Sequence, residues 1–403
     1  MNGVSQFSLA KTLTKVICLL ALVLFTVTAY AQEDDALKIQ SNAVSDSIPD
    51  DFVIATLLVS EPGDILYSRL GHAALHLQCP QHNLDYVFTY EAEDIKERPL
   101  GFLAGKLRMG LAALDPKEYI NEHIERRRGL KEYRLNLPVE NKRELWRALD
   151  NHLMEGMDLK YDYLRYGCAH STLLMLKEGL GDTIMTYGAW PDHFKGTTRR
   201  EVTYHHIHKD KWTTFLLHFI VNGVIDDRFC TNQDKVIIPA DLPFILQNAT
   251  ISGIPVINSD PVQIVPPGRP LETGWLTPML VAVVLLALTI ICALLKCPAM
   301  DYVLLGIQTL LGIIAVWLVF FSTLCCTEWS WLIIPFNPLP AIFWKWRRKW
   351  VLPYAIVLSI WCAFMFFWPH LLTDNAYIIV AIAIVTSYIR MYFQSRIFPY
   401  YEK

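Results

Sequence analysis

The stretch KYDYLRYGCAHSTLLML, residues 160–176, places one cysteine, Cys168, between a tyrosine-rich segment and an apolar run. Small polar residues followed by an apolar run predict the start of a helix. Cys168 then lies at or just before the first helical turn, where free backbone N–H groups and the positive end of the helix dipole favour a thiolate. Because the thiolate is the nucleophilic form of cysteine, this stretch predicts a catalytic thiol. The alternative is a buried cysteine that packs as a small hydrophobic residue.

A second stretch, ILYSRLGHAALHL at residues 65–77, supplies the partner that such a thiol needs. Gly71 marks a turn or a close approach before His72, and the alternating apolar run that follows predicts a strand. On that strand Ala74 and His76 share the face of His72. A histidine at the start of a strand and a cysteine at the start of a helix are the two parts of a thiol–imidazole pair. A lone histidine is more often structural, so the prediction depends on both stretches together.

Other residues near these stretches are candidates for a third or supporting role. A hairpin connection at 79–85 and a return strand at 86–90 place Glu91 or Glu93 opposite His72, where a carboxylate can orient the imidazole. The alternative for each of these two residues is a solvated strand end. The remaining candidate helpers are His76, His170 and Tyr166.

Composition and charge limit the class of protein. The chain has 403 residues, of which 53% are hydrophobic, and this fraction is above the globular norm and predicts a membrane part. The formal net charge of −3 argues against a general nucleic-acid binder. The chain has nine cysteines, and Cys79, Cys168 and Cys230 are those of the soluble part. A Cys79–Cys230 disulfide with Cys168 free is therefore possible in an oxidising compartment.

The order of segments predicts an exported domain followed by a membrane domain. Residues 1–31 have the pattern of a signal peptide, with an apolar core and the cleavage site Ala29-Tyr30-Ala31, and an uncleaved anchor is the alternative. We expect an acidic, polar linker at 32–51, the catalytic domain at 52–258 and a proline-rich linker at 259–274. Residues 275–396 are apolar and predict a helical transmembrane domain of about five spans.

One of these five spans is expected to be irregular. Four apolar runs predict regular spans, and between the second and the third of them lies the segment 328–350, whose prolines break a regular helix. If this segment crosses the membrane, its basic residues become cytoplasmic, as the positive-inside tendency favours; they are Lys345, Arg347, Arg348 and Lys349. Its part 331–344 is a candidate cover and seat for an acyl chain, and plain structural packing is the equal alternative.

Two further clusters are interpreted as surface features. The triplet Arg126-Arg127-Arg128 predicts a solvated face, with a contact to anionic lipid headgroups as the alternative. The row His205-His206-Ile207-His208 has no second ligand cluster at a zinc-like spacing, which favours a surface loop over a metal site. We therefore expect no metal and no cofactor.

Four segments together resemble one known family. They are YSRLGHAALHL, with Ser68, Arg69 and Gly71 as supporting motif residues, the segment that ends in YRLNLP, the segment YDYLRYGCAHST, and VIIPADLP. Over residues 52–258 they are similar to the Lnb N-terminal periplasmic domain of bacterial exported proteins, and the membrane segment FNPLP is similar to that family's asparagine–proline motif. The family usually has asparagine before the cysteine and Ala-Thr after it, where this chain has Gly167, Ala169 and His170.

The resemblance implies a fold class and an activity. The implied fold is α+β, a circularly permuted papain-like (NlpC/P60-like, LRAT-type) periplasmic domain followed by an α-helical transmembrane bundle. The implied activity is that of an Lnb-type lipoprotein N-acyltransferase. In such an enzyme Cys168 and His72 would move a fatty acyl chain from a phospholipid donor, through a thioester, to the N-terminal amine of a diacylglyceryl-cysteine lipoprotein. The implied location is the bacterial inner membrane, with the catalytic domain in the periplasm and no nucleic-acid partner.

Two other functions stay open. The same pair of residues would serve a periplasmic cell-wall cysteine peptidase or amidase, which needs an open polar groove and gains nothing from several spans. The other is a non-enzymatic membrane scaffold, in which Cys168 and His72 are merely buried.

Overall fold

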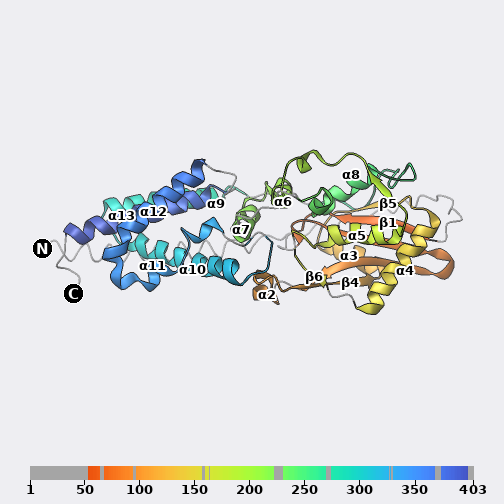
Figure 1. The fold of residues 1–403 in the computed structure, drawn as a ribbon, viewed down its shortest axis with the longest axis horizontal. Helices are drawn as coiled ribbons and strands as arrows, with labels where there is room; N and C mark the ends of the chain where they lie inside the picture. The colour runs from red at the N-terminus through yellow and green to blue at the C-terminus, as the bar shows by residue number, and fades with distance from the viewer. Residues whose placement is uncertain are drawn as a thin grey trace.

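The computed structural model describes residues 53–63, 68–93, 97–156, 159–162, 164–221, 230–268, 274–325, 327, 330–367 and 374–397. The predicted signal peptide at 1–31 and the predicted linker at 32–51 lie outside the described residues. The described part has two regions that lie end to end. One contains the strands and the helices that pack on them, and the other is a bundle of apolar helices (Figure 1).

The first region is built on a seven-stranded antiparallel sheet with the strand order β10-β5-β1-β2-β3-β4-β6. Its strands are β1 (Ile54–Ser60), β2 (His72–Cys79), β3 (Leu84–Ala92), β4 (Arg108–Leu114), β5 (Leu130–Arg134), β6 (Leu159–Lys160) and β10 (Val262–Val265). The prediction of a strand that begins at His72 is confirmed. The β2–β3 connection is the short helix η3 (Pro80–His82) followed by Asn83 in the left-handed region, so the predicted hairpin is also confirmed.

Each face of the sheet has its own apolar core. Ala73, Leu75 and Leu77 alternate into the larger core, against helices α4 (Val139–Glu155) and α5 (Cys168–Leu180). Ala74 belongs to the smaller core on the other face, together with Tyr119 of helix α3 (Pro116–Glu125). Because side chains alternate along a strand, the His72 side chain lies on the same face of the sheet as Ala74, which is the face that α3 covers.

A smaller unit follows helix α5 in the chain. It has a three-stranded sheet of β7 (Met185–Tyr187), β8 (Ala249–Ile251) and β9 (Ile254–Pro255), with helices α6 (Arg199–Ile207), α7 (Lys211–Ile220) and α8 (Leu242–Gln247). The predicted surface loop at His205–His208 is wrong, because Thr198 and Glu201 form a capping box that starts α6 through this row.

The expected linker at 259–274 is also corrected. Its residues Val262–Val265 form β10, which pairs with β5 at the edge of the main sheet. Prolines flank this short run and do not interrupt it, and an edge strand tolerates prolines at its ends. The domain that contains the main sheet therefore extends at least to Val265.

The expected option of a Cys79–Cys230 disulfide is not what the structure has. Cys79 is a free cysteine, which excludes that bridge, and it is buried at the end of β2, opposite Leu84 of β3. Its side chain lies within the sheet domain, so it packs there as a small hydrophobic residue.

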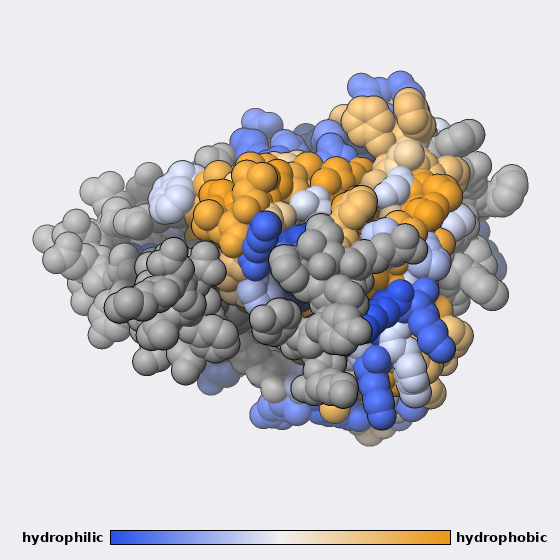
Figure 2. Space-filling view, turned by 90° about the vertical axis from the view of Figure 1, so that its left-hand side faces the viewer, coloured by the Kyte–Doolittle hydropathy of each residue, from blue (hydrophilic) through white to orange (hydrophobic). Residues whose placement is uncertain are grey.

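The second region contains helices α9 (Pro278–Leu294), α10 (Ala299–Phe321), α12 (Arg347–Phe367) and α13 (Ala376–Ile397). In the described residues three helical stretches are long and apolar enough to cross a membrane, namely Ala299–Phe321, Trp344–Phe367 and Ala376–Gln394, while α9 is a shorter apolar helix. Seen from the bundle end, apolar side chains gather over the upper part of the surface (Figure 2). Such a surface suits a lipid environment.

The segment between α10 and α12 is irregular, as predicted. It contains η7 (Trp331–Ile333), α11 (Leu339–Ile342) and η8 (Trp344–Trp346). Gln308 in the middle of α10 donates to the Pro335 carbonyl at 2.7 Å, and Trp344 packs on Tyr302 near the start of α10. The segment thus runs antiparallel to α10, which is the path that an irregular crossing requires. The total of five crossings stays a prediction.

Close packing fixes this segment against α10. A Cβ atom at Gly312 would lie 2.4 Å from Cα of Asn337, so only glycine admits this approach. The Asn337 side-chain amide donates to the carbonyls of Ile333 and Ile334, which a regular helix would have satisfied by its own N–H groups. The part of this segment at residues 332–337 is therefore packed against the bundle, whereas Leu339, Ile342 and Phe343 are exposed.

The bundle docks on one end of the main sheet through the loop after α10. The Thr323 backbone N–H donates to the Ala104 carbonyl at 3.1 Å, and Lys160 Nζ of β6 donates to the Thr323 carbonyl at 3.1 Å. The Cys325 N–H donates to Asp162 Oδ2 at 3.0 Å. This end of the sheet, where β4 and β6 lie, is the end nearest the bundle (Figure 1).

Candidate active site

Cys168 is the first residue of α5, so the predicted helix start is confirmed. Gly167 is the N-cap in an extended conformation with no side-chain cap, and the first helical bond runs from the Ser171 N–H to the Gly167 carbonyl at 3.0 Å. The N–H groups of the residues from Cys168 to His170 precede that bond and have no helical acceptor. They are the free donors that favour negative charge at this point.

Cys168 and His72, nearly a hundred positions apart in the chain, line the same pocket, and each is the residue whose charge and hydrogen bonding most favour the ionised form of the other. Burial raises the pKa of the Cys168 thiol, but the charge and hydrogen bond of His72 and the Ala73 N–H outweigh it, so the pKa is lowered. Burial lowers the pKa of His72, but the charge and hydrogen bond of Cys168, with the charge of Glu91, outweigh it and raise the pKa. The two opposite shifts favour a thiolate–imidazolium pair.

The other side of the imidazole is held by Thr89 of β3. His72 Nε2 lies 2.6 Å from Thr89 Oγ1, and the Thr89 hydroxyl donates to Glu91 Oε1 at 3.0 Å. Because that hydroxyl proton is used on Glu91, Thr89 Oγ1 accepts from His72 Nε2–H. His72 Nδ1 is therefore the nitrogen that remains for the sulfur.

Of the two carboxylates predicted to orient His72, Glu91 is the one that lies beside the imidazole. Its Oε1 lies 3.6 Å from His72 Nε2, so it acts on the imidazole by charge and through Thr89. The other candidate, Glu93, forms an ion pair with Arg98 and accepts from the Arg108 N–H, which turns it to a different partner.

Gly71 sets the start of β2. Its φ is +85°, and a Cβ atom there would lie 2.8 Å from the Ser60 carbonyl oxygen. A side chain at this position would be strained by the backbone conformation and by the clash. Glycine thus lets the chain turn sharply into the strand that carries His72.

A pocket of about 240 Å³ contains both members of the pair. Its described lining residues all belong to the exported domain, between Ser68 and Pro239. Apolar side chains line part of it, namely Leu70, Met109, Leu114, Ile237 and Pro239. The expectation that residues 331–344 cover the thiol is not met, since none of them lines this pocket.

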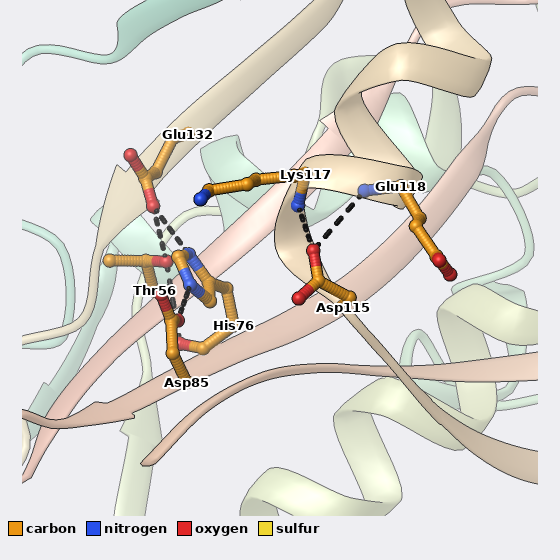
Figure 3. Close-up of polar contacts among 7 residues, drawn as sticks. All are labelled: Thr56, His76, Asp85, Asp115, Lys117, Glu118 and Glu132. Atoms are coloured by element: carbon orange, nitrogen blue, oxygen red, sulfur yellow. Dashed lines mark hydrogen bonds and ion pairs between the residues drawn. The ribbon is translucent and has the colours of Figure 1, made fainter. Parts of the chain in front are cut away.

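His76 does not assist the pair. Its Nδ1 lies 3.1 Å from Glu132 and its Nε2 lies 2.7 Å from Asp85, on the same face but farther along β2 (Figure 3). Burial lowers the pKa of His76, but its hydrogen bonds to Glu132 and Asp85 outweigh burial and raise the pKa. Both ring nitrogens are used, so His76 ties three strands together.

The remaining candidate helpers also lie outside the pocket lining. Tyr166 is exposed and its ring contacts His170 edge to face, while His170 is placed near Gln233 and Asp234. Among the supporting motif residues, Ser68 lines the pocket, whereas Arg69 forms an ion pair with Asp210 at 3.0 Å.

Four residues that the sequence analysis did not select contribute to the pocket region: Thr89, Tyr119, His123 and Arg128. The sequence could have indicated Thr89, because it lies two positions before Glu91 and therefore on the same face of the strand. The interpretation of Arg128 as part of a solvated face is wrong. Its side chain is buried and its Nε donates to the Glu61 carbonyl, because the chain folds back into β5 directly after it.

A separate cluster has the donors that a metal ion takes. His193, His206 and Asp241 have donor atoms within 4.8 Å of one another. The Asp241 carboxylate lies 3.2 Å from His193 Nε2 and 3.1 Å from His206 Nε2, so the three side chains already satisfy one another by hydrogen bonds. None of them lines the Cys168 pocket.

The candidate site is at the bundle-facing end of the sheet. Glu91 on β3 lies opposite Gly110 on β4. The neighbour of Gly110 on β4, Met109, lies opposite Leu159 on β6. One residue farther, Lys160 reaches the bundle loop at Thr323. Asp162, six residues before the thiol, accepts from Cys325 of the same loop.

Comparison with known proteins gives two family matches. A family model described as the Lnb N-terminal periplasmic domain matches residues 41–187, and one described as the Lnb transmembrane domain matches residues 271–398. No curated protein and no solved structure matches the chain. The two matches identify a periplasmic domain followed by a transmembrane domain, in the order that the structure has.

Proposed function

Because the chain belongs to the Lnb family, we propose that it is a membrane-bound cysteine acyltransferase. It would move a fatty acyl chain from a phospholipid to the N-terminal amine of a diacylglyceryl-cysteine lipoprotein, from the periplasmic face of the inner membrane. The α5–β2 arrangement of thiol and imidazole, with histidine before cysteine along the chain, supports a permuted papain-like catalytic core for this enzyme.

One observation carries the proposal: Cys168 and His72, whose opposite pKa shifts favour a thiolate–imidazolium pair, line a partly apolar pocket at the end of the sheet that docks on the bundle. A nucleophile held there is near the plane in which lipids lie. Both proposed substrates are anchored in that plane, so the encounter takes place at a high local concentration. A soluble cell-wall fragment would gain nothing from this placement.

The first half-reaction transfers the acyl chain to the enzyme. The Cys168 thiolate attacks an ester carbonyl carbon of the phospholipid and forms a C–S bond. As the ester C–O bond breaks, the imidazolium of His72 gives its proton to the leaving glycerol oxygen. The free N–H groups at the start of α5 stabilise the oxyanion of the tetrahedral intermediate. A lysophospholipid leaves and an S-acyl Cys168 remains.

The second half-reaction transfers the chain to the acceptor. The neutral α-amine attacks the thioester carbonyl, and the now neutral His72 takes the amine proton. The C–S bond breaks, and the amide product leaves with the thiolate–imidazolium pair restored. Thr89 and Glu91 hold His72 with Nδ1 toward sulfur in both steps.

Mass spectrometry of a lipoprotein N-terminus, with and without this protein, tests the proposal. Cells that contain the wild-type protein are expected to yield the triacylated form. Cells with Cys168→Ser or His72→Ala, at equal protein level in the membrane, are expected to yield only the diacylated form.

Triacylation that persists in both variants contradicts the proposal and favours a scaffold. Cleavage of purified peptidoglycan fragments by the wild-type protein, lost in Cys168→Ser, with unchanged lipoproteins, favours the cell-wall peptidase or amidase.

A further inference from the structure

One end of the Cys168 pocket has three buried polar atoms without a hydrogen-bond partner in the described residues. They are Arg128 Nη2, the Tyr119 hydroxyl and His123 Nε2, and all three side chains line the pocket. The residues are 9%, 3% and 4% exposed, respectively. Because an unpaired buried polar group destabilises a folded protein by about 1–3 kcal/mol, three in one place indicate a ligand that pairs with them.

Arg128 supplies a positive charge on which burial and the negative charges of Cys168 and Glu91 act. Its Nε donates to the Glu61 carbonyl, and in the described part of the chain no carboxylate forms an ion pair with it. Burial lowers the pKa of Arg128, as expected for a cation that water does not solvate. The guanidinium stays charged at neutral pH because the ordinary pKa of arginine lies far above 7. An anion is the natural partner.

Tyr119 and His123 complete a set of matched donors and acceptors. His123 Nδ1–H donates to the Tyr119 carbonyl at 2.8 Å, so Nε2 carries a lone pair. Burial, the largest cause, lowers the pKa of His123 to about 4, so the ring is neutral at pH 7. The Tyr119 hydroxyl stays protonated, since burial raises its pKa. The cluster thus offers one charged donor, one neutral donor and one acceptor.

The three carboxylates among the described lining residues are already engaged. Glu91 accepts from Thr89, Glu93 forms an ion pair with Arg98, and Glu122 forms an ion pair with Arg126 at 2.8 Å. Among the described residues no carboxylate is left for this cluster, which favours an anion brought by the substrate. A phospholipid carries its phosphodiester a few bonds from the ester that Cys168 attacks, whereas a diacylglyceryl-cysteine acceptor carries a cationic or neutral amine and no phosphate.

We propose that Arg128 and Tyr119 bind the phosphodiester of the acyl donor, and that His123 Nε2 accepts a hydrogen bond from its headgroup. This subsite rests on the proposed function, and it assigns donor recognition to three residues outside the Cys168–His72 pair. It makes the first half-reaction selective for phosphate-bearing esters. It also disfavours a protonated amine near Cys168, so that the acceptor reacts in its neutral form.

A comparison of two acyl donors tests the subsite in the full-length protein. One donor is a phospholipid in mixed micelles, and the other is a p-nitrophenyl ester of the same acyl chain, which has no phosphate. The variants are Tyr119→Phe, which removes only the unpaired hydroxyl, and Arg128→Lys, which keeps the charge and loses the fork. We expect each variant to raise KM for the phospholipid about tenfold and to leave acylation by the p-nitrophenyl ester within twofold of wild type.

Two outcomes overturn the subsite. If a variant slows acylation by both donors equally, its side chain acts at the reacting carbonyl or supports the folding of the domain, and it does not recognise the phosphate. Unchanged kinetics with both donors removes the two side chains from the site. Two matched controls should not alter KM. Tyr133→Phe changes a buried tyrosine on β5 that does not line the pocket. Arg147→Lys changes an exposed arginine on α4.

A binding measurement separates the subsite from the acyltransferase activity. Non-cleavable diether phospholipid and diether glycerol are compared as protectants of Cys168 against alkylation. The subsite predicts that the phosphate-bearing diether protects wild type at about tenfold lower concentration, and that Tyr119→Phe removes this difference. Equal protection by both diethers in wild type overturns the subsite even where acyl transfer is observed. A wild-type preference for the phosphate-bearing diether without acyl transfer to Cys168 instead overturns the proposed function alone.

Discussion

Cys168 and His72 each depend on the other for their charge. Burial by itself would favour a neutral thiol and a neutral imidazole, and the mutual hydrogen bond and charge reverse both tendencies. The lowered pKa of Cys168 and the raised pKa of His72 bound a pH window in which the ion pair exists. Below that window sulfur is protonated, and above it the imidazole is neutral.

This window gives a pH prediction. Wild-type Cys168 is expected to react with iodoacetamide well below the ordinary thiol pKa of about 8.5. In His72→Ala the charge and hydrogen bond that lower the Cys168 pKa are gone and burial remains, so the alkylation profile moves to higher pH. The rate is followed by the mass of the Cys168 peptide. Coincident profiles for the two proteins would show that His72 does not act on the sulfur.

Thr89 is expected to position His72, since its hydroxyl accepts from Nε2 and donates to Glu91. Thr89→Val keeps the shape and removes the hydroxyl, so kcat should fall about tenfold, which corresponds to about 1.4 kcal/mol. Thr89→Ser restores the hydroxyl and should recover most of the rate. A Ser variant as slow as the Val variant would mean that packing, and not the hydrogen bond, explains the loss.

At the scale of elements, Asp162 ties the segment before α5 to the membrane half. Its carboxylate accepts from the Leu164 N–H at 3.1 Å and from the Cys325 N–H at 3.0 Å. Asp162→Asn replaces one acceptor by a donor, so a buried N–H loses its partner at a cost of about 1–3 kcal/mol. We expect a lower thermal unfolding midpoint in detergent and slower acylation of Cys168.

The control for that change is Asp150→Asn, which removes an exposed carboxylate on α4. It should leave the unfolding midpoint and the rate unchanged. A normal midpoint and rate in Asp162→Asn would mean that the contact with Cys325 does not couple the two halves.

The sequence predicts local elements of this site better than their partners. The starts of α5 at Cys168 and of β2 at His72 follow from short-range patterns, and counting across the hairpin places Glu91 or Glu93 opposite His72, of which the structure selects Glu91. The burial of Arg128 depends on the turn into β5, and the pairing of β10 depends on a strand more than a hundred residues away. Such contacts are set by tertiary packing, which periodicity along the chain does not encode.

At the scale of the whole molecule, the direction of each membrane segment follows from the path of residues 330–346. The contacts with α10 run from its middle, at Gln308, to its N-terminal part, at Tyr302, so the basic residues that follow lie at the end of the bundle away from the sheet domain. We expect a cysteine placed at Lys349 to be labelled by a membrane-impermeant reagent only after the membrane is opened. Labelling in intact spheroplasts would contradict five spans.

The central claim is that Cys168 takes an acyl chain from a phospholipid, and its most direct test is the mass of the purified full-length protein after incubation with phospholipid and no acceptor. The account predicts an increase by one acyl chain on the peptide that contains Cys168, its release by neutral hydroxylamine, and its absence in Cys168→Ser. Lipoprotein acylation that continues while this peptide stays unmodified, or an acyl chain found on another residue, would contradict it.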